Sequence, residues 1–129
     1  MVNKAVLHPQ EIETFYIIPT LRKHLALALI QQGKMQKDVA TLLGINSAAI
    51  SQYRSNKRGK NVEFPELIIN NINESAKKIT DQHTYFKEIQ YLLKVIRDTK
   101  FLCQIHHQFS SVPSDCHPEK VGCFKGGYI

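Results

Sequence analysis

All three cysteines of the chain, and half of its six histidines, fall in the C-terminal part of the sequence. These residues are Cys103, His106, His107, Cys116, His117 and Cys123. Cys103 and His106 are three positions apart, so on a helix both side chains point to the same side. The prolines and glycine that follow can turn Cys116 and Cys123 back toward them. Three thiolates and one imidazole are suitable ligands for a tetrahedral zinc ion or an iron–sulfur cluster.

The interpretation we favour for this site is an iron–sulfur cluster that senses iron or redox state. A sensor would explain why a regulator without any other effector domain carries such a tail. Zinc is the alternative, and it would make the tail a closed structural clip. A competing interpretation leaves the thiols unliganded, with Cys103 as a small buried apolar residue. Disulfides alone would leave one of the three cysteines unpaired, and cytosolic conditions disfavour them.

A second group of residues indicates a polyanion partner. The 129-residue chain has 17 Lys and Arg against 11 Asp and Glu, a net charge of +6. Between Thr20 and Lys60 there are eight basic residues and one acidic residue, so this segment is +7 and the remainder is −1. The basic residues are Arg22, Lys23, Lys34, Lys37, Arg54, Lys57, Arg58 and Lys60. This concentration is typical of nucleic-acid binding, although a solvated helix face can also produce it.

Apolar periodicity in the same segment predicts the helices that would position these side chains. A first helix spans about residues 20–33 and ends at Gly33, with an apolar stripe of Leu21, Leu25, Ala28 and Leu29. A short second helix begins near Gln36, and its inward residues are Val39, Ala40, Leu42 and Leu43. Gly44 supplies a tight turn, Ile45 enters the core, and Asn46 or Ser47 caps the next helix.

A third helix is predicted over residues 47–54, with Ile50 and Tyr53 facing inward. The outward residues are then Ser47, Ala48, Ser51, Gln52 and Arg54. Two short helices joined by a glycine-containing turn of three or four residues form a helix–turn–helix, whose last helix can enter a major groove. The competing interpretation is a pair of packed helices that never contacts DNA.

The stretch LRKHLALALIQQGKMQKDVATLLGINSAAISQYRSNKRG resembles the Cro and phage-repressor-like (XRE-type) helix–turn–helix family. It is particularly similar to small regulators of archaea and some bacteria, which often carry a cysteine cluster after the DNA-binding domain. The resemblance covers about a third of the chain and implies a compact bundle of four or five helices with residues 47–54 as the recognition helix. Lys34 and Met35 stand where a small residue and Ser or Thr are usual, which weakens the cap of the second helix; Gln36 can still place a polar group there.

Side-chain chemistry predicts the roles of these residues on double-stranded DNA. Gln52 can pair with adenine, and Ser47 and Ser51 can hydrogen-bond to a base or a phosphate. The methyl groups of Ala48 and Ala49 can contact thymine if they face the groove. The phosphates would be met by Arg54, Lys57, Arg58 and Lys60 after the helix, and by Arg22 and Lys23 from the first helix.

Two further helices are predicted downstream, over residues 64–80 and over residues 83–107. The apolar stripe of the first consists of Ile68, Ile72, Ala76 and Ile79. The broader stripe of the second consists of Tyr85, Phe86, Ile89, Leu92, Leu93, Ile96 and Leu102. A face this broad is hard to cover within a small domain, which favours a homodimer on a palindromic operator. The predicted fold is therefore all-α, with an N-terminal arm (1–19), a helix–turn–helix domain (20–80), a long dimerisation helix (81–109) and a Cys/His-rich tail (110–129).

Other classes of protein fit the sequence less well. No apolar run reaches the length of a membrane span, and no signal peptide opens the chain, so we expect a cytoplasmic protein. Cys103 with His106 or His107 is the one pair that could support nucleophilic catalysis, and no phosphate loop or paired carboxylates accompany it, so we predict no enzyme. RNA binding is disfavoured because aromatic and basic residues do not interleave. An antitoxin would use the same DNA-binding unit, with a tail that neutralises a partner protein.

Overall fold

The computed structural model describes residues 6–55 and 62–110, and in these two stretches all regular secondary structure is helical. The elements are α1 (Pro9–Ile12), η1 (Glu13–Ile17), α2 (Ile18–Gln31), α3 (Gln36–Leu43), α4 (Ser47–Arg54), α5 (Glu66–Lys78), α6 (Gln82–Asp98) and α7 (Phe101–Phe109). The predicted all-α class is thereby confirmed for the described residues. No helix among them is both long and apolar enough to cross a membrane.

Residues 9–19 run directly into the first long helix. α1, η1 and α2 follow one another without a break, and the predicted boundary between residues 19 and 20 falls inside α2. η1 is a π-helical turn, in which the N–H of Ile18 donates to the carbonyl of Glu13 five residues before. The turn matters because Ile12 and Ile17 are also five residues apart, about 140° out of phase on an α-helix. With the wider turn both side chains are fully buried.

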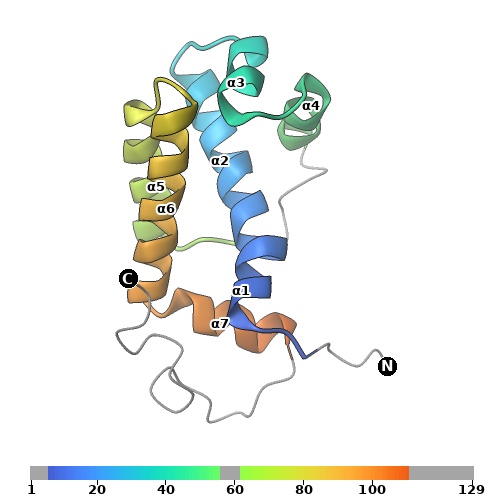
Figure 1. Cartoon of the computed structure of the whole chain (residues 1–129), viewed down its shortest axis with the longest axis vertical. Helices are drawn as coiled ribbons and strands as arrows, with labels where there is room; N and C mark the ends of the chain where they lie inside the picture. The colour runs from blue at the N-terminus through green and yellow to red at the C-terminus, as the bar shows by residue number, and fades with distance from the viewer. Residues whose placement is uncertain (1–5, 56–61, 111–129) are drawn as a thin grey trace.

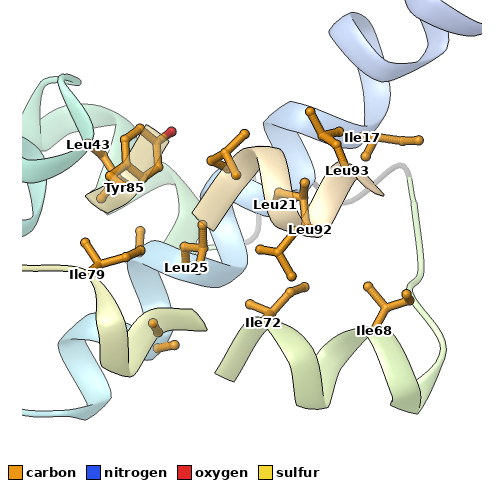
Figure 2. Packing of buried hydrophobic residues seen from close by; sticks show 14 of the residues in the cluster. Ile17, Leu21, Leu25, Leu43, Ile68, Ile72, Ile79, Tyr85, Leu92 and Leu93 are labelled. Carbon is orange, nitrogen blue, oxygen red and sulfur yellow. The ribbon is translucent and has the colours of Figure 1, made fainter. Parts of the chain in front are cut away.

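α2, α5 and α6 form the main body of the molecule (Figure 1). Their apolar stripes meet in one core, in which Leu21 and Leu25 of α2 lie near Ile72 of α5 and Leu92 of α6 (Figure 2). The predicted stripe of α5 is confirmed, because Ile68, Ile72, Ala76 and Ile79 are all at most 1% exposed. α3 and α4 lie at one end of this body, beside the C-terminal half of α2 (Figure 1).

The predicted single helix over residues 83–107 was wrong: it is two helices. Lys100 adopts a left-handed conformation with φ 61°, which ends α6 and redirects the chain into α7. α7 then crosses the end of the body opposite α3 and α4 (Figure 1). The apolar face of α6 packs on α5, α7 and α3 of the same chain, so the argument for a dimer from an uncovered face does not hold. Phe86, placed on that face by the sequence, is 64% exposed, whereas Tyr85 and Ile89 are buried.

Contacts between the two ends of the described chain hold α7 in place. The backbone N–H of Leu7 donates to Ser110 Oγ at 2.8 Å, and the Leu7 carbonyl accepts a hydrogen bond from His106 Nε2. The rings of Tyr16 and Phe109 stack with their centroids 4.2 Å apart. Residues about a hundred positions apart in the sequence are therefore directly connected.

Candidate nucleic-acid interface

α3 and α4 are joined by a three-residue turn whose geometry follows from its sequence. Gly44 has φ 68°, a left-handed conformation that glycine adopts without the steric cost of a Cβ. Asn46 then caps α4, because its Oδ1 accepts a hydrogen bond from the backbone N–H of Ala49 at 2.9 Å. Ile50 and Tyr53 are buried on the inner face of α4. The predicted turn, the cap and the inward residues of α4 are thus confirmed.

The outer face of α4 agrees with the prediction except at two positions. Ser47, Ala48, Ser51 and Arg54 are exposed. Gln52 is half-buried, and its Oε1 is buried without a hydrogen-bond donor among the described residues. Ala49 is only 3% exposed, so it does not meet the condition of facing the groove on which its methyl contact with thymine depended. The error comes from helix phase, because Ala49 precedes Ile50 and lies on the same inward side as Tyr53 four positions later.

Gln36, the first residue of α3, links the start of α3 to the outer face of α4. Its Nε2 donates to the carbonyl of Ser47 at 3.0 Å and to Ser51 Oγ at 2.8 Å. Its Oε1 accepts a hydrogen bond from Arg54 Nη1 at 3.2 Å. The sequence indicated only that Gln36 could place a polar group near the start of this helix. The bridge joins residues eleven to eighteen positions apart, so no local pattern could have revealed it.

The N-terminal end of α3 lies beside this bridge and is not capped by any side chain among the described residues. Met35 occupies the cap position and is 69% exposed, and Lys37 in the first turn is exposed as well. The first N–H groups of a helix need acceptors, and together with the helix dipole they favour an anion. These N–H groups and Lys37 favour an anionic group such as a phosphate at the start of α3, whereas the carboxylate of Asp38, also exposed in the first turn, opposes it.

The two basic residues of α2 are covered to different degrees by neighbouring helices. Lys23 is only 8% exposed, which does not favour its predicted contact with the DNA backbone. α2 is enclosed by α3, α4 and α5, and this covers positions outside its apolar stripe too. Arg22 is half-buried, and its Nε donates to the Tyr85 hydroxyl at 3.4 Å. Burial alone would lower the pKa of Arg22, but interactions with Tyr85 and Tyr53 outweigh it and raise the pKa, which keeps the guanidinium charged.

Several predicted site residues lie outside the described residues: Lys57, Arg58, Lys60, Cys116 and Cys123. Of the predicted metal ligands, Cys103 and His106 are both half-buried on α7. Residues 6–55 and 62–110 contain no cluster of three or more His, Cys, Asp or Glu side chains that could hold a metal ion by themselves.

The hydrogen bond of His106 bears on its suitability as a ligand. A carbonyl oxygen can only accept, so Nε2 of His106 carries the proton that it donates to Leu7. In the neutral ring this leaves the lone pair on Nδ1, and metal-bound histidines commonly donate their other N–H to a carbonyl in this way. The tautomer of His106 therefore fits metal binding through Nδ1.

Comparison of the chain with known protein families, with curated proteins and with solved structures gives no match.

Proposed function

We propose that this chain is a sequence-specific DNA-binding transcriptional regulator, in which α3 and α4 form a helix–turn–helix and α4 is the recognition helix. The observation that carries the proposal is the division of α4 into two faces. Ile50 and Tyr53 fix one face to the body, while the other presents Ser47, Ser51 and Arg54 to solvent. An α-helix with its side chains is about 10–12 Å in diameter, which fits the width of about 12 Å of a B-DNA major groove.

The start of α3 and the local charge support the same proposal. An uncapped helix start with exposed Lys37 lies beside α4 and is suited to a DNA phosphate next to the groove. The segment from Thr20 to Lys60 carries the positive excess of the chain, although Lys23 contributes to it from a buried position. An electrostatic attraction to the DNA backbone is therefore expected before any base is contacted.

The proposal is tested by selecting bound sequences from a random DNA library with the full-length protein. A shared sequence element is expected, and Arg54→Ala should weaken its binding about tenfold. Lys87→Ala is the matched control, because Lys87 is an exposed residue of α6 and its replacement removes the same charge. Failure to enrich any sequence, or equal losses for Arg54→Ala and Lys87→Ala, would contradict the proposal.

The proposal includes a homodimer bound to a palindromic site. The reason is the short length of the recognition helix, and not an uncovered apolar face. A helix of about 12 Å spans only about four base pairs of B-DNA at 3.4 Å each, which is too few for a specific site. A symmetric pair would double the contacted sequence, with the half-sites about one helical turn apart. The selected element should therefore be palindromic, and sedimentation should show two chains per site; one chain on a non-palindromic element would rule out the pair.

The Cys/His site is proposed to hold an iron–sulfur cluster, and the contact of His106 Nε2 with the Leu7 carbonyl supports a metal ligand there, because it leaves Nδ1 of the neutral ring without that proton. Its ligands would be Cys103, His106, Cys116 and Cys123, and the bound cluster would supply sensitivity to iron or redox state. Anaerobic purification with iron, sulfide and zinc analysis tests this directly. Iron and sulfide that are lost in Cys116→Ala and Cys123→Ala would support the cluster. One zinc per chain would make the tail a structural clip, and metal-free protein would exclude both.

A further inference from the structure

A cavity of about 420 Å³ lies toward the end of the body that α7 crosses, away from α3 and α4 (Figure 1). Its walls come from the segment before α5, the first turn of α5, the end of α6, and α7. Cavities that bind small molecules have volumes of about 300–1,000 Å³. This cavity is therefore large enough for a small organic molecule, and its walls indicate which kind.

Apolar side chains form most of the wall. The rings of Phe64 and Phe101 have their centroids 5.9 Å apart and are tilted by 58° to each other. Leu67 also lines the cavity, and this large apolar side chain is 57% exposed. Removal of such a surface from water by an apolar group is favourable. The cavity therefore favours a ligand with an apolar or aromatic body.

The charge at the cavity is negative. Glu63 is the one charged side chain among the described residues that line it, and Glu66 is exposed in the adjacent first turn of α5. The start of α5 opposes them, because no described side chain caps it and a helix start carries about half a positive charge. Two full negative charges outweigh that half charge. A cationic group is therefore favoured, and the faces of aromatic rings attract cations as well.

The nearest basic groups do not supply a competing positive charge inside the cavity. Lys100 lies between Thr99 and Phe101 in the sequence, but it is not among the residues that line the cavity. The ring of His24 lies 5.7 Å from the ring of Phe64, centroid to centroid. Burial, and then the charge of Lys23, lower the pKa of His24 below 6.5, so this ring is mainly neutral at pH 7.

We infer that this cavity is a binding site for a small organic cation, in which a protonated amine or quaternary ammonium group is carried on an apolar or aromatic body. The body would lie against Phe64, Leu67 and Phe101, with the positive group toward Glu63. This inference goes beyond the proposed function and does not rest on it, because the cavity lies away from α3 and α4.

The test titrates the full-length protein with three probes that share one aromatic ring: benzylamine, which is cationic at pH 7, benzyl alcohol, which is neutral, and phenylacetate, which is anionic. Nuclear magnetic resonance spectra of ¹⁵N-labelled protein give the affinity and the position of binding. We expect benzylamine to bind with a Kd of about 1 mM, with the largest changes at residues 63–68 and 99–104. The other two probes should bind about tenfold more weakly.

Three variants separate the contributions of charge and apolar surface. Glu63→Gln should weaken benzylamine about fivefold and leave benzyl alcohol unchanged. Glu74→Gln is the matched control, because it removes the same charge from an exposed position on α5 that does not line the cavity. Leu67→Ala should weaken benzylamine and benzyl alcohol alike. Both Glu63 and Leu67 are exposed, so thermal unfolding should show that these variants remain folded.

The remaining outcomes would overturn the inference. Equal affinities for the three probes, or equal effects of Glu63→Gln and Glu74→Gln, would show that the cavity does not select a cation. A preference for phenylacetate would show that the start of α5 dominates the charge. No change at residues 63–68 and 99–104 with about 10 mM benzylamine would exclude the site. These titrations contain no DNA, so their result is separate from the test of DNA binding.

Discussion

At the scale of single residues, a two-point ion pair joins η1 to the end of α6. Arg97 Nε donates to Glu13 Oε2 at 2.8 Å, and Arg97 Nη2 donates to Glu13 Oε1 at 3.1 Å. The Glu13 side chain is only 7% exposed and that of Arg97 is 21% exposed. A two-point contact of this kind is geometrically specific, and loss of one partner leaves the other charge without compensation in a poorly solvated place.

Arg97→Met is therefore expected to lower the free energy of unfolding by about 2–3 kcal/mol, somewhat less than for a fully buried pair. Adding Glu13→Gln should restore a large part of this loss, because the uncompensated carboxylate is then removed. Lys94→Met is the control, since it disrupts an exposed pair with Asp98 and should cost under about 0.5 kcal/mol. Urea titrations give the free energy of unfolding of the wild type and the three variants. Equal losses for Arg97→Met and Lys94→Met would show that the Arg97–Glu13 pair does not contribute more than an exposed pair.

A second effect at this scale concerns pH. Burial, and to a lesser degree the charge of Lys23, lower the pKa of His24 below its ordinary value of 6.5. The folded protein thus disfavours the protonated ring relative to the unfolded chain. The stability that results is fully present above pH 6.5, and is lost as the pH falls below 6.5 toward the pKa of the folded state. His24→Gln, which does not titrate, should lose less stability between pH 7 and pH 5 than wild type. Urea unfolding at both pH values tests this, and identical losses would contradict it.

At the scale of elements, helix ends marked by glycine were predictable and the end of α6 was not. Gly33 and Gly44 both have positive φ angles, and both ended helices where the sequence placed the ends. Thr99 and Lys100 interrupt a continuous apolar pattern without glycine or proline, so the local sequence favours continuation. The bend is explained by packing over long sequence distances, since α7 contacts α1.

The left-handed conformation of Lys100 leads to a prediction about this bend. The left-handed conformation costs a non-glycine residue about 1–2 kcal/mol. Glycine avoids this cost, but it also increases the conformational entropy of the unfolded chain, which cancels part of the gain in stability. Lys100→Gly should therefore stabilise the protein by about 0.5–1 kcal/mol. Lys100→Ala removes the same charge but keeps the Cβ, and should give no stabilisation. Thermal unfolding measures the melting temperatures of the two variants. Equal values would show that relief of the left-handed backbone conformation does not stabilise the protein.

The candidate interface shows the same limit of local reasoning. The exposure of Ser47, Ser51 and Arg54 followed from helical periodicity alone, because one buried face determines the opposite one. The bridge made by Gln36 and the burial of Lys23 depend on which helices pack against α3 and α2. Such contacts cannot be obtained from the spacing of residues within one element.

At the scale of the whole molecule, charge should govern the association with DNA. Each phosphate that is neutralised contributes about 0.9 to the slope of log affinity against log salt concentration. The affinity of the wild-type protein should fall steeply between low and physiological salt, and Lys37→Ala at the start of α3 should reduce the slope by about one. Lys87→Ala should leave it unchanged, because Lys87 lies on α6. Fluorescence anisotropy at several salt concentrations measures the slopes, and a flat wild-type slope would be incompatible with phosphate contacts.

The π-turn of η1 has a consequence for how the length of this helix can vary. Such a turn accommodates one residue more than an α-helix of the same rise, while Ile12 before it and Leu21 after it both reach the core. Deletion of the single codon for exposed Thr14 should therefore convert the π-turn into regular α-helix. The residues before and after it should keep their orientation toward the core. A single-codon deletion at Leu27 of α2 would instead rotate every preceding residue by about 100° relative to the core. Insertions and deletions in homologous genes are thus expected to collect at η1 and to be absent from α2.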